Sequence, residues 1–180
     1  MVERNGIMNK ISIQYYKSKY GELIIGSYED QLCICDWRYR KMRDQIDKRI
    51  QTGLNAEYVE ESSAIIANTI TQLEEYFAGN KQIFDIPLLL VGTDFQKQVW
   101  EELLKIPFGK TGTYLEQSVK LNNPKAIRAV ASANGANAIS IIIPCHRIIG
   151  SDGKLVGYAG GLDVKKKLLR LENQTQTELF

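Results

Sequence analysis

Residues 113–135, TYLEQSVKLNNPKAIRAVASANG, contain two predicted short helices and the turn that joins them. Thr113 and Glu116 form the pattern of a capping box, which starts the first helix, and we expect this helix to end near Leu121. The second helix is predicted over residues 123–134, because an asparagine followed by a proline is typical of a helix start and a glycine follows the last residue. Two short helices with a three-residue turn between them predict a helix-turn-helix.

A longer predicted helix with a capping box of its own precedes this pair. Thr93 and Gln96 indicate where it starts. One apolar stripe along it is expected to face the core: Phe95, Val99, Trp100, Leu103 and Leu104. Because the composition of the elements changes at Gly92, we predict a domain boundary there and a mostly helical domain over residues 92–180.

Residues 1–91 have the pattern of a small sheet that carries one helix. Residues 11–37 contain three runs of β-forming side chains separated by turn residues, which predicts antiparallel strands. Apolar side chains at spacings of three and four predict a helix over residues 62–78. Residues 82–90 are expected to be extended, with Pro87 at an edge or a strand end. The two halves together predict an α+β fold, and we find no chemistry in the first.

The composition limits the class of protein. The 180 residues are 44% hydrophobic and 24% charged, which is typical of a globular chain and not of a disordered one. No stretch reaches membrane-spanning length and residues 1–12 are polar, so we expect no membrane partner. An odd cysteine number does not fit a disulfide framework and favours a reducing compartment, the cytoplasm.

Cys33 and Cys35 are two positions apart in a predicted strand, so we expect both side chains on one face. Tetrahedral zinc needs about four ligands, and the chain could supply them only with all three cysteines and its single histidine. We therefore predict no metal site and interpret these cysteines as small packing residues.

Charge is divided unevenly along the chain. Residues 93–180 carry 12 Lys and Arg against 8 Asp and Glu, and residues 1–92 carry 11 against 13. This distribution permits a polyanionic partner for the second half. In the second helix of the pair, Arg128 is expected to project beyond small alanine and serine side chains. A solvated arginine on an ordinary alanine-rich helix fits that pattern equally well.

The stretch IIIPCHRIIG, residues 141–150, places the only histidine beside a cysteine. The thiolate is the reactive form of cysteine and an imidazole can take the thiol proton, so Cys145 and His146 are a candidate nucleophile and base. Contact between them requires a turn after Pro144, since successive strand residues point to opposite faces. Glu172 is the candidate carboxylate behind His146. A buried core thiol next to a histidine is the alternative interpretation.

Residues 157–161, GYAGG, predict a tight backbone turn that can approach a flat ligand. Backbone N–H groups could donate to that ligand, and Tyr158 could stack on it or form a hydrogen bond. A plain turn before the last helix is the alternative.

Three segments together resemble the 6-O-methylguanine-DNA methyltransferases, DNA-repair proteins that are consumed by their own reaction. They are GTDFQKQVWEELLKIPFGKTGTY, NNPKAIRAVASANGAN and IPCHRIIGSDGKLVGYAGGLDVKKKLLRLE, in the order and spacing of that family. The likeness covers about residues 90–172, and residues 1–89 match only in general layout. It implies a ribonuclease-H-like sheet-plus-helix domain followed by a winged helix-turn-helix-like domain.

The resemblance implies that the alkyl group of 6-O-alkylguanine, and of 4-O-methylthymine, passes irreversibly to Cys145. The partner would be duplex DNA with the damaged nucleotide flipped out, and the protein would act as a monomer without a cofactor. His146 and Glu172 match the pair that deprotonates the cysteine through a water, so Cys145 should ionise more readily than a free thiol.

The remaining site residues also follow from the resemblance. Asn137 matches the residue that braces the turn of the cysteine, Tyr114 the residue that rotates the nucleotide out, and Arg128 the finger that fills the gap. The residues that match contacts with the DNA backbone are Gln96, Asn123 and Ser151. The residues that match the base pocket are Tyr158, Ala159 and Ile148.

The chain departs from the family pattern at three places. Ala138 replaces a common proline, which implies a looser turn, and Leu115 stands where a smaller or polar residue often contacts DNA. Residues 134–136 lack a bulky side chain, which implies room for larger alkyl groups. A lesion-binding winged-helix module without transfer and a Cys-His hydrolase are the alternatives. The retained Cys145 argues against the first, and neither accounts for all the matched segments at once.

Overall fold

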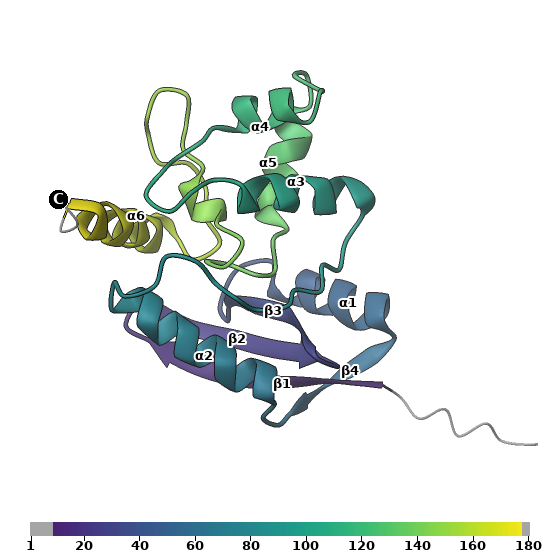
Figure 1. Ribbon diagram of the computed structural model, residues 1–180. Coiled ribbons are helices and arrows are strands. Elements are labelled where there is room, and N and C mark those ends of the chain that lie inside the picture. The colour runs from purple at the N-terminus through teal and green to yellow at the C-terminus, as the bar shows by residue number, and fades with distance from the viewer. Residues whose placement is uncertain (1–8, 178–180) are drawn as a thin grey trace, which may run out of the picture.

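The protein is described by a computed structural model over residues 9–177 (Figure 1). Its elements are β1 (Asn9–Ser18), β2 (Gly21–Tyr28), β3 (Gln31–Trp37), α1 (Arg43–Leu54), β4 (Ala56–Glu60), α2 (Ala64–Phe77), α3 (Asp94–Leu104), α4 (Tyr114–Lys120), α5 (Ile127–Gly135), the 3-10 helix η1 (Cys145–Arg147) and α6 (Leu162–Thr177). The predicted α+β fold is confirmed. We call residues 9–91 the N-terminal region and residues 92–177 the C-terminal region.

The four strands form one sheet in the order β3-β2-β1-β4. The pairs β1–β2 and β2–β3 are antiparallel, as predicted, and β4 runs parallel to β1. The segment before α3 lies along the outer edge of β3, where Leu32 N donates to Pro87 O at 2.8 Å and Leu89 N donates to Leu32 O at 2.8 Å. Pro87, which has no N–H, lies at a sheet edge as expected.

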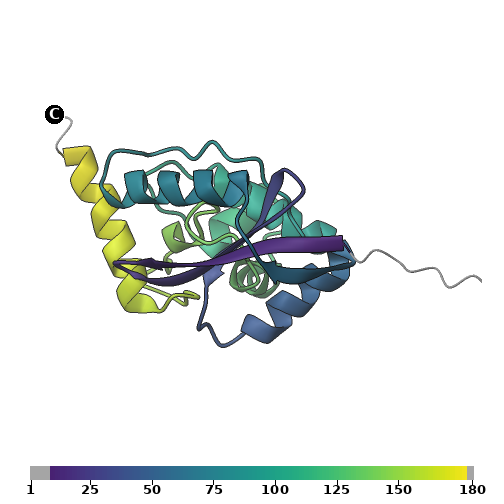
Figure 2. The same ribbon diagram turned by 90° about the horizontal axis from the view of Figure 1, so that it is seen from below.

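Two elements of the N-terminal region, α1 and β4, were not predicted. Among the twelve residues of α1 only Ile46 and Ile50 are buried, so charged side chains conceal its apolar spacing. The expectation of a single helix is therefore wrong. Figure 2 shows α2 and α1 on opposite sides of the strands, and each helix packs in its own apolar cluster, α2 through Ile66 and Leu73 and α1 through its two isoleucines.

A β-bulge overturns the expectation that the two cysteines of β3 share a face. The pairing with β2 shifts between Gly26 and Ser27: Gly26 pairs with Ile34, but the next residue, Ser27, pairs with Leu32. Cys33 is thus the extra residue of the bulge, and the alternation of side chains is broken at this point. Cys33 packs in the α1 cluster, whereas Cys35 packs in the α2 cluster. Both are buried packing residues without a disulfide.

The start of the C-terminal region follows the prediction closely. Thr93 and Gln96 make both hydrogen bonds of the capping box of α3, and Thr113 and Glu116 make both bonds of the capping box of α4. The core side of α3 buries three of the five predicted residues, Val99, Trp100 and Leu103. Leu104, which was also predicted to face the core, is 44% exposed, so this part of the prediction is wrong.

The second helix of the pair, α5, begins at Ile127 and not just after Asn123. Asn123 N donates to Ser118 O at 2.9 Å, and Asn122, which has a φ of 55°, donates its N–H to Val119 O at 2.9 Å. This pattern is a Schellman motif that ends α4, so the predicted N-cap belongs to the preceding helix. Six residues therefore separate the two helices. They still pack together, and Asn134 Nδ2 of α5 donates to Gln117 Oε1 of α4 at 2.8 Å.

The two regions share one apolar core. The cluster on the α2 side of the sheet contains Leu23 and Cys35 from the strands together with Leu103, Ile143 and Leu168 from the C-terminal region. In Figure 1, α4 and α5 lie at the end of the molecule farthest from the sheet. No helix within residues 9–177 is both long and apolar enough to cross a membrane.

Candidate active site

Two tight turns place Cys145. Pro144 has φ −83° and ψ 61°, and Cys145 N donates to Ile143 O at 2.8 Å, which is the geometry of an inverse γ-turn. Three residues earlier Ile141 has a φ of 73°, an unfavourable conformation for a β-branched residue. Cys145 then opens the 3-10 helix η1, so the predicted turn at the Cys-His pair is confirmed.

Asn137 braces this turn as the resemblance implies. Its Nδ2 donates to Ile143 O at 2.9 Å and contacts Cys145 Sγ at 3.3 Å, while its Oδ1 accepts from Ile139 N at 2.9 Å. One amide thus connects both ends of the turn to the sulfur.

The turn at Ala138, which the sequence predicts to be looser than one with a proline, is bonded to the sheet. Ala138 O accepts from Cys35 N at 2.9 Å, and Ser140 N donates to Cys35 O at 2.7 Å. Ser140 Oγ also donates to the buried carboxylate of Asp36 at 3.0 Å. Backbone pairing with β3 therefore fixes the position of this turn.

Arg40 reaches the same turn from the loop after β3. Its Nη1 donates to Asp36 and, at 3.0 Å, to Asn137 O, and its Nη2 donates to Gly135 O. The Arg40 and Asp36 side chains are 5% and 0% exposed, so both charges are buried and paired. Residues of the N-terminal region therefore hold the turn that positions the nucleophile.

His146 and Glu172 form the predicted pair. His146 Nε2 lies 2.7 Å from Glu172 Oε1, and both side chains are 0% exposed. Burial opposes ionisation of Glu172, but hydrogen bonds and charges from His146 and Arg147 outweigh it and lower the Glu172 pKa to about 2. An ionised carboxylate can only accept, so the proton of the imidazole is on Nε2 and the lone pair is on Nδ1. No described residue bonds to Nδ1.

Three further donors hold the carboxylate of Glu172. Tyr76 Oη donates to Oε1 at 2.8 Å, Gly109 N donates to Oε2 at 3.1 Å, and Arg147 donates through Nε and Nη2 at 3.0 Å each. The carboxylate is therefore fully bonded and cannot turn away from the imidazole. Tyr76 brings a second contribution from the N-terminal region.

Neither Cys145 nor His146 is ionised readily in the resting site. Burial raises the pKa of the Cys145 thiol, although the hydrogen bond from Asn137 lowers it in part. Burial also lowers the pKa of His146 below 6.5, against the opposing contact with Glu172. The expectation that Cys145 ionises more readily than a free thiol is thus wrong. Burial thus favours the neutral form of both groups, so the thiol has to lose its proton during the reaction.

A cavity of about 640 Å³ leads to Cys145. Its walls combine both regions of the chain, with Tyr39, Arg40, Lys41 and Met42 from the N-terminal region and Tyr114, Ala131, Asn134, Gly135, Gly157, Tyr158, Ala159, Gly160 and Gly161 from the C-terminal region. The structure therefore brings Tyr114, Tyr158 and Ala159 together around the nucleophile. Ile148 is 0% exposed and is not in this lining, and its N–H donates to Cys145 O at 3.2 Å.

The GYAGG turn packs against an indole. Trp37 Nε1 donates to Tyr158 Oη at 3.1 Å, and the two rings meet edge to face with centroids 6.2 Å apart. A Cβ on Gly160 would lie 2.7 Å from Trp37 Nε1, and Gly161 has a φ of 87°. Glycine is therefore favoured at position 160 because the indole lies too close for a side chain, and at position 161 because the backbone is left-handed.

Lys165 is a buried cation near the nucleophile. It is 0% exposed, and its Nζ donates to Val156 O at 2.6 Å. Burial lowers its pKa to about 8, while the Cys145 sulfur acts in the opposite direction.

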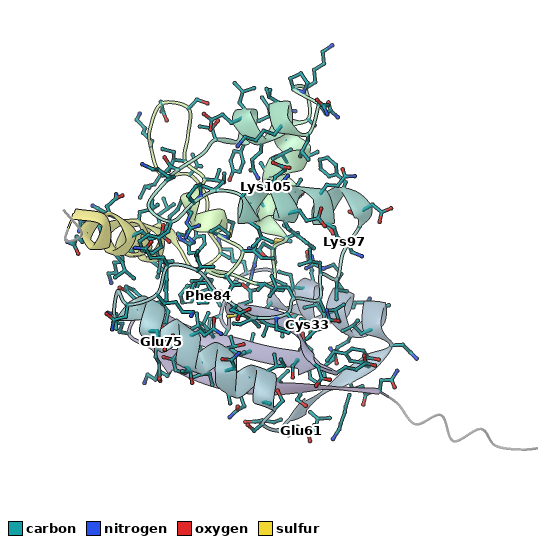
Figure 3. The ribbon with its side chains drawn as sticks, in the orientation of Figure 1. Cys33, Glu61, Glu75, Phe84, Lys97 and Lys105 are labelled. Carbon is teal, nitrogen blue, oxygen red and sulfur yellow. The ribbon has the colours of Figure 1, made fainter. Side chains whose placement is uncertain are left out.

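The residues that match DNA contacts lie apart from the cavity. Arg128 is exposed on α5, Asn123 is exposed between α4 and α5, and Ser151 is exposed in the loop after η1. Gln96 is half-buried, and its Oε1 accepts from Thr93 N at 3.0 Å in the capping box. In Figure 3, Glu61 and Glu75 lie on the N-terminal region, whereas Lys97 lies on α3 and Lys105 directly follows that helix.

Sequence reasoning missed the contributions of the N-terminal region, Asp36, Trp37, Arg40 and Tyr76. No signal marked them, since each is an ordinary residue of a strand, loop or helix until the fold brings it to the site. Arg147 did have a signal, because it directly follows the Cys-His pair. Within residues 9–177 no three Cys, His, Asp or Glu side chains gather as a possible metal site.

A cysteine beside a cavity, with a bonded histidine and carboxylate and a helix-turn-helix, defines a thiol-dependent group-transfer or hydrolytic protein with a DNA-binding type of fold. Two family models match the chain: 6-O-methylguanine DNA methyltransferase, ribonuclease-like domain, over residues 11–90, and 6-O-methylguanine DNA methyltransferase, DNA binding domain, over residues 94–174. The chain belongs to the 6-O-methylguanine DNA methyltransferase family, as the resemblance implied.

Individual relatives agree with this assignment. A Methanosarcina barkeri protein named methylated-DNA–protein-cysteine methyltransferase is 45% identical over 156 residues, which cover 87% of this chain and 93% of the relative. Mycobacterium tuberculosis OGT, whose crystal structure was determined in complex with DNA, superposes with a TM-score of 0.79 at 37% identity. That match covers 91% of this chain and 94% of the OGT chain.

Proposed function

We propose that the chain repairs DNA by moving the alkyl group of 6-O-alkylguanine to its own Cys145, once per protein molecule. The observation that carries this proposal is the cavity in which Cys145 lies with Tyr114 and Tyr158, while Asn137 holds its sulfur at 3.3 Å. Relatives of the chain bear the name methylated-DNA–protein-cysteine methyltransferase, and the similar M. tuberculosis protein was solved with DNA.

The chemical step transfers one proton and one alkyl group. The thiol proton of Cys145 passes to His146 Nδ1, directly or through a water, and Glu172 stabilises the resulting cation. The thiolate attacks the alkyl carbon, and the bond between that carbon and O6 breaks with its electron pair left on the base. The base then takes up a proton, so guanine and a cysteine thioether are the products. Proton and alkyl group balance, and the step uses no cofactor.

Tyr158 and Ala159 are proposed to bind the leaving base. As the alkyl–oxygen bond breaks, the base gains negative charge, which fixed donors in a buried site stabilise more than water does. The Tyr158 hydroxyl and the Ala159 N–H are the donors assigned to it. Ile148 contributes its backbone carbonyl. We propose the same transfer for 4-O-methylthymine, because its alkyl group is also bound to an oxygen beside a ring nitrogen. The single pyrimidine ring is smaller than guanine and would fit the same pocket.

The lesion must leave the double helix to reach the sulfur, since an alkyl group on a base edge is inaccessible inside a duplex. We assign Arg128 to the gap left in the stack and Tyr114 to the rotation of the nucleotide. Gln96, Asn123 and Ser151 are assigned to the DNA backbone. The exposed positions of Arg128, Asn123 and Ser151 support these roles.

We propose a division into residues 1–91 and 92–180, with the second part carrying the DNA contacts and the nucleophile. A single copy holds every assigned residue, which supports action as a monomer. Three free cysteines support a reducing compartment, the cytoplasm.

The intact mass of the protein after incubation with methylated duplex DNA tests the proposal. We expect the mass to rise by one methyl in place of one proton, repair to stop at one lesion per protein, and peptide mapping to place the methyl on Cys145. Cys145→Ala should bind the same duplex and transfer nothing. Repair beyond equimolar protein would favour a hydrolase, and an unchanged mass of the wild type would favour a module that only binds lesions.

A further inference from the structure

The indole of Trp37 reaches the candidate active site from the sheet. Trp37 is the last residue of β3 and is 4% exposed, and its Nε1 donates to Tyr158 Oη at 3.1 Å. An indole nitrogen can only donate, so the phenol oxygen must accept in this bond. The hydrogen of the Tyr158 hydroxyl is therefore not used by Trp37 and remains for another acceptor.

Glycines on both sides fix where the indole lies. A Cβ on Gly160 would be 2.7 Å from two atoms of the indole, and a Cβ on Gly21 would be 3.2 Å from its six-membered ring. The backbone N–H of Trp37 donates to Asp36 Oδ1 at 3.0 Å, which fixes the base of the side chain. The ring is thus held between β2 and the GYAGG turn, with its N–H directed at the Tyr158 oxygen.

This bond has an electronic consequence for the phenol. A hydroxyl oxygen that accepts a hydrogen bond becomes a stronger donor through its own hydrogen, because the two bonds polarise each other. Burial and the nearby Cys145 sulfur raise the pKa of Tyr158, and the bond from Trp37 acts against them. The phenol therefore stays protonated but is polarised towards donation.

We propose that Trp37 is a positioning residue, which orients and polarises the Tyr158 hydroxyl so that it donates to the departing base. As the alkyl carbon moves to Cys145 Sγ, the electron pair of the broken bond stays on the base, and the Tyr158 hydrogen bond becomes stronger at that moment. This inference rests on the proposed role of Tyr158. It makes the N-terminal region part of the transfer step itself.

The experiment compares Trp37→Phe, Tyr158→Phe and the double variant with 6-O-benzylguanine as a free base. Trp37→Phe should slow transfer roughly fivefold to tenfold, the size of one lost hydrogen bond. In the Tyr158→Phe background the same change should slow transfer by less than about twofold, because the hydroxyl on which the indole acts is gone. The loss should also shrink with 6-O-benzyl-8-azaguanine, whose leaving base is more acidic and needs less help.

Trp100→Phe is the matched control. Trp100 is 2% exposed and its Nε1 donates to Ala133 O at 2.8 Å, so the substitution removes a similar buried bond without contact to Tyr158. It should lower the melting temperature but keep the wild-type ratio of rates for the two benzyl substrates. Wild-type transfer by Trp37→Phe, or losses that multiply in the double variant, would refute the role of Trp37. Wild-type transfer by Tyr158→Phe would instead refute the proposed role of Tyr158.

Discussion

The hydroxyl of Tyr76 and the carboxylate of Glu172 are joined by a 2.8 Å hydrogen bond between residues 96 positions apart. Tyr76 lies on α2 and Glu172 on α6, so this bond connects the N-terminal region to the acid that orients the candidate base. Both side chains are 0% exposed, so the bond is buried away from bulk solvent. The packing of the two regions therefore contributes to the position of this carboxylate.

Tyr76→Phe should therefore reduce both stability and transfer. Loss of a buried hydrogen bond to a charged group costs about 1–3 kcal/mol, and we expect a several-fold lower transfer rate because Glu172 is held less firmly. Tyr58→Phe is the control, since Tyr58 Oη also donates to a carboxylate, Asp47 at 2.9 Å, on the far side of the sheet. The melting temperature should fall in both variants, whereas the transfer rate should fall only in Tyr76→Phe. Equal transfer rates in the two variants would show that the Tyr76 bond is purely structural.

The pH dependence of transfer should report on His146. Its pKa is lowered by burial, so the neutral imidazole persists below pH 6.5 and the rate should fall only as the pH drops through that lowered value. His146→Ala should transfer slowly at neutral pH and recover as rising pH ionises Cys145, whose pKa is raised. Rates with benzylguanine from about pH 5 to pH 10 would check this. A His146→Ala rate equal to wild type at neutral pH would contradict the proton path.

Stability should decline in acid because of Glu172. Its folded pKa is about 2 and its ordinary value is 4.5, so its contribution is complete above about pH 4.5 and is lost as the pH falls through about 2. This difference corresponds to on the order of 3 kcal/mol. The free energy of unfolding, measured by urea titration at several pH values, should fall less steeply below pH 4.5 in Glu172→Gln. The quantity to compare is the slope of the unfolding free energy against pH. The absolute free energy also changes, because Glu172→Gln leaves Arg147 less well paired at every pH.

Asn137→Ala should uncouple the sulfur from its turn. The substitution removes the contacts to Cys145 Sγ and Ile143 O and leaves Ile139 N without its partner, which should cost about 2–4 kcal/mol. We expect transfer to slow at least tenfold while DNA binding, measured by fluorescence anisotropy, stays within about twofold. If the transfer rate falls only in proportion to the fraction of folded protein, Asn137 does not position the thiol.

Arg128→Ala should affect duplex substrates selectively. If Arg128 fills the gap in the stack, its loss should slow repair of methylated duplex by at least tenfold and leave the reaction with free benzylguanine unchanged, since a free base needs no flipping. Lys125→Ala removes another exposed cation near the start of α5 and is the control, with a loss confined to salt-dependent affinity. Equal losses on both substrates would argue against the stacking role.

Local signals in the sequence predicted the site wherever one segment contained the whole feature. The two capping boxes and the Cys-His turn depend on residues within four positions of one another, and each was confirmed. Local signals failed at Asn123, where one asparagine suited both the end of α4 and the start of α5. They also failed at Cys33, because a bulge depends on the partner strand and cannot be seen in one strand alone.

Long-range contacts were beyond prediction from a single sequence for a physical reason. Trp37, Arg40 and Tyr76 carry no pattern that distinguishes them from packing or surface residues. They matter only because β3 pairs with the turn before Cys145 and α2 reaches Glu172 on α6. The thiol pKa was mispredicted in direction for the same reason. A cysteine next to a histidine indicates activation, but burial by distant segments dominates the charge balance.

The shared core has a consequence for the order in which the protein is made. The ribosome releases β3 and α2 early and Cys145 later, but Leu168 of the common cluster and Glu172 emerge only afterwards. The nascent chain consequently displays its thiol before the carboxylate that orients His146 exists, and before Leu168 can seal the apolar cluster. A chain whose synthesis stops between Cys145 and Leu168 contains the cysteine but lacks Leu168 and Glu172. The site is therefore complete only after α6 has packed against the rest of the molecule.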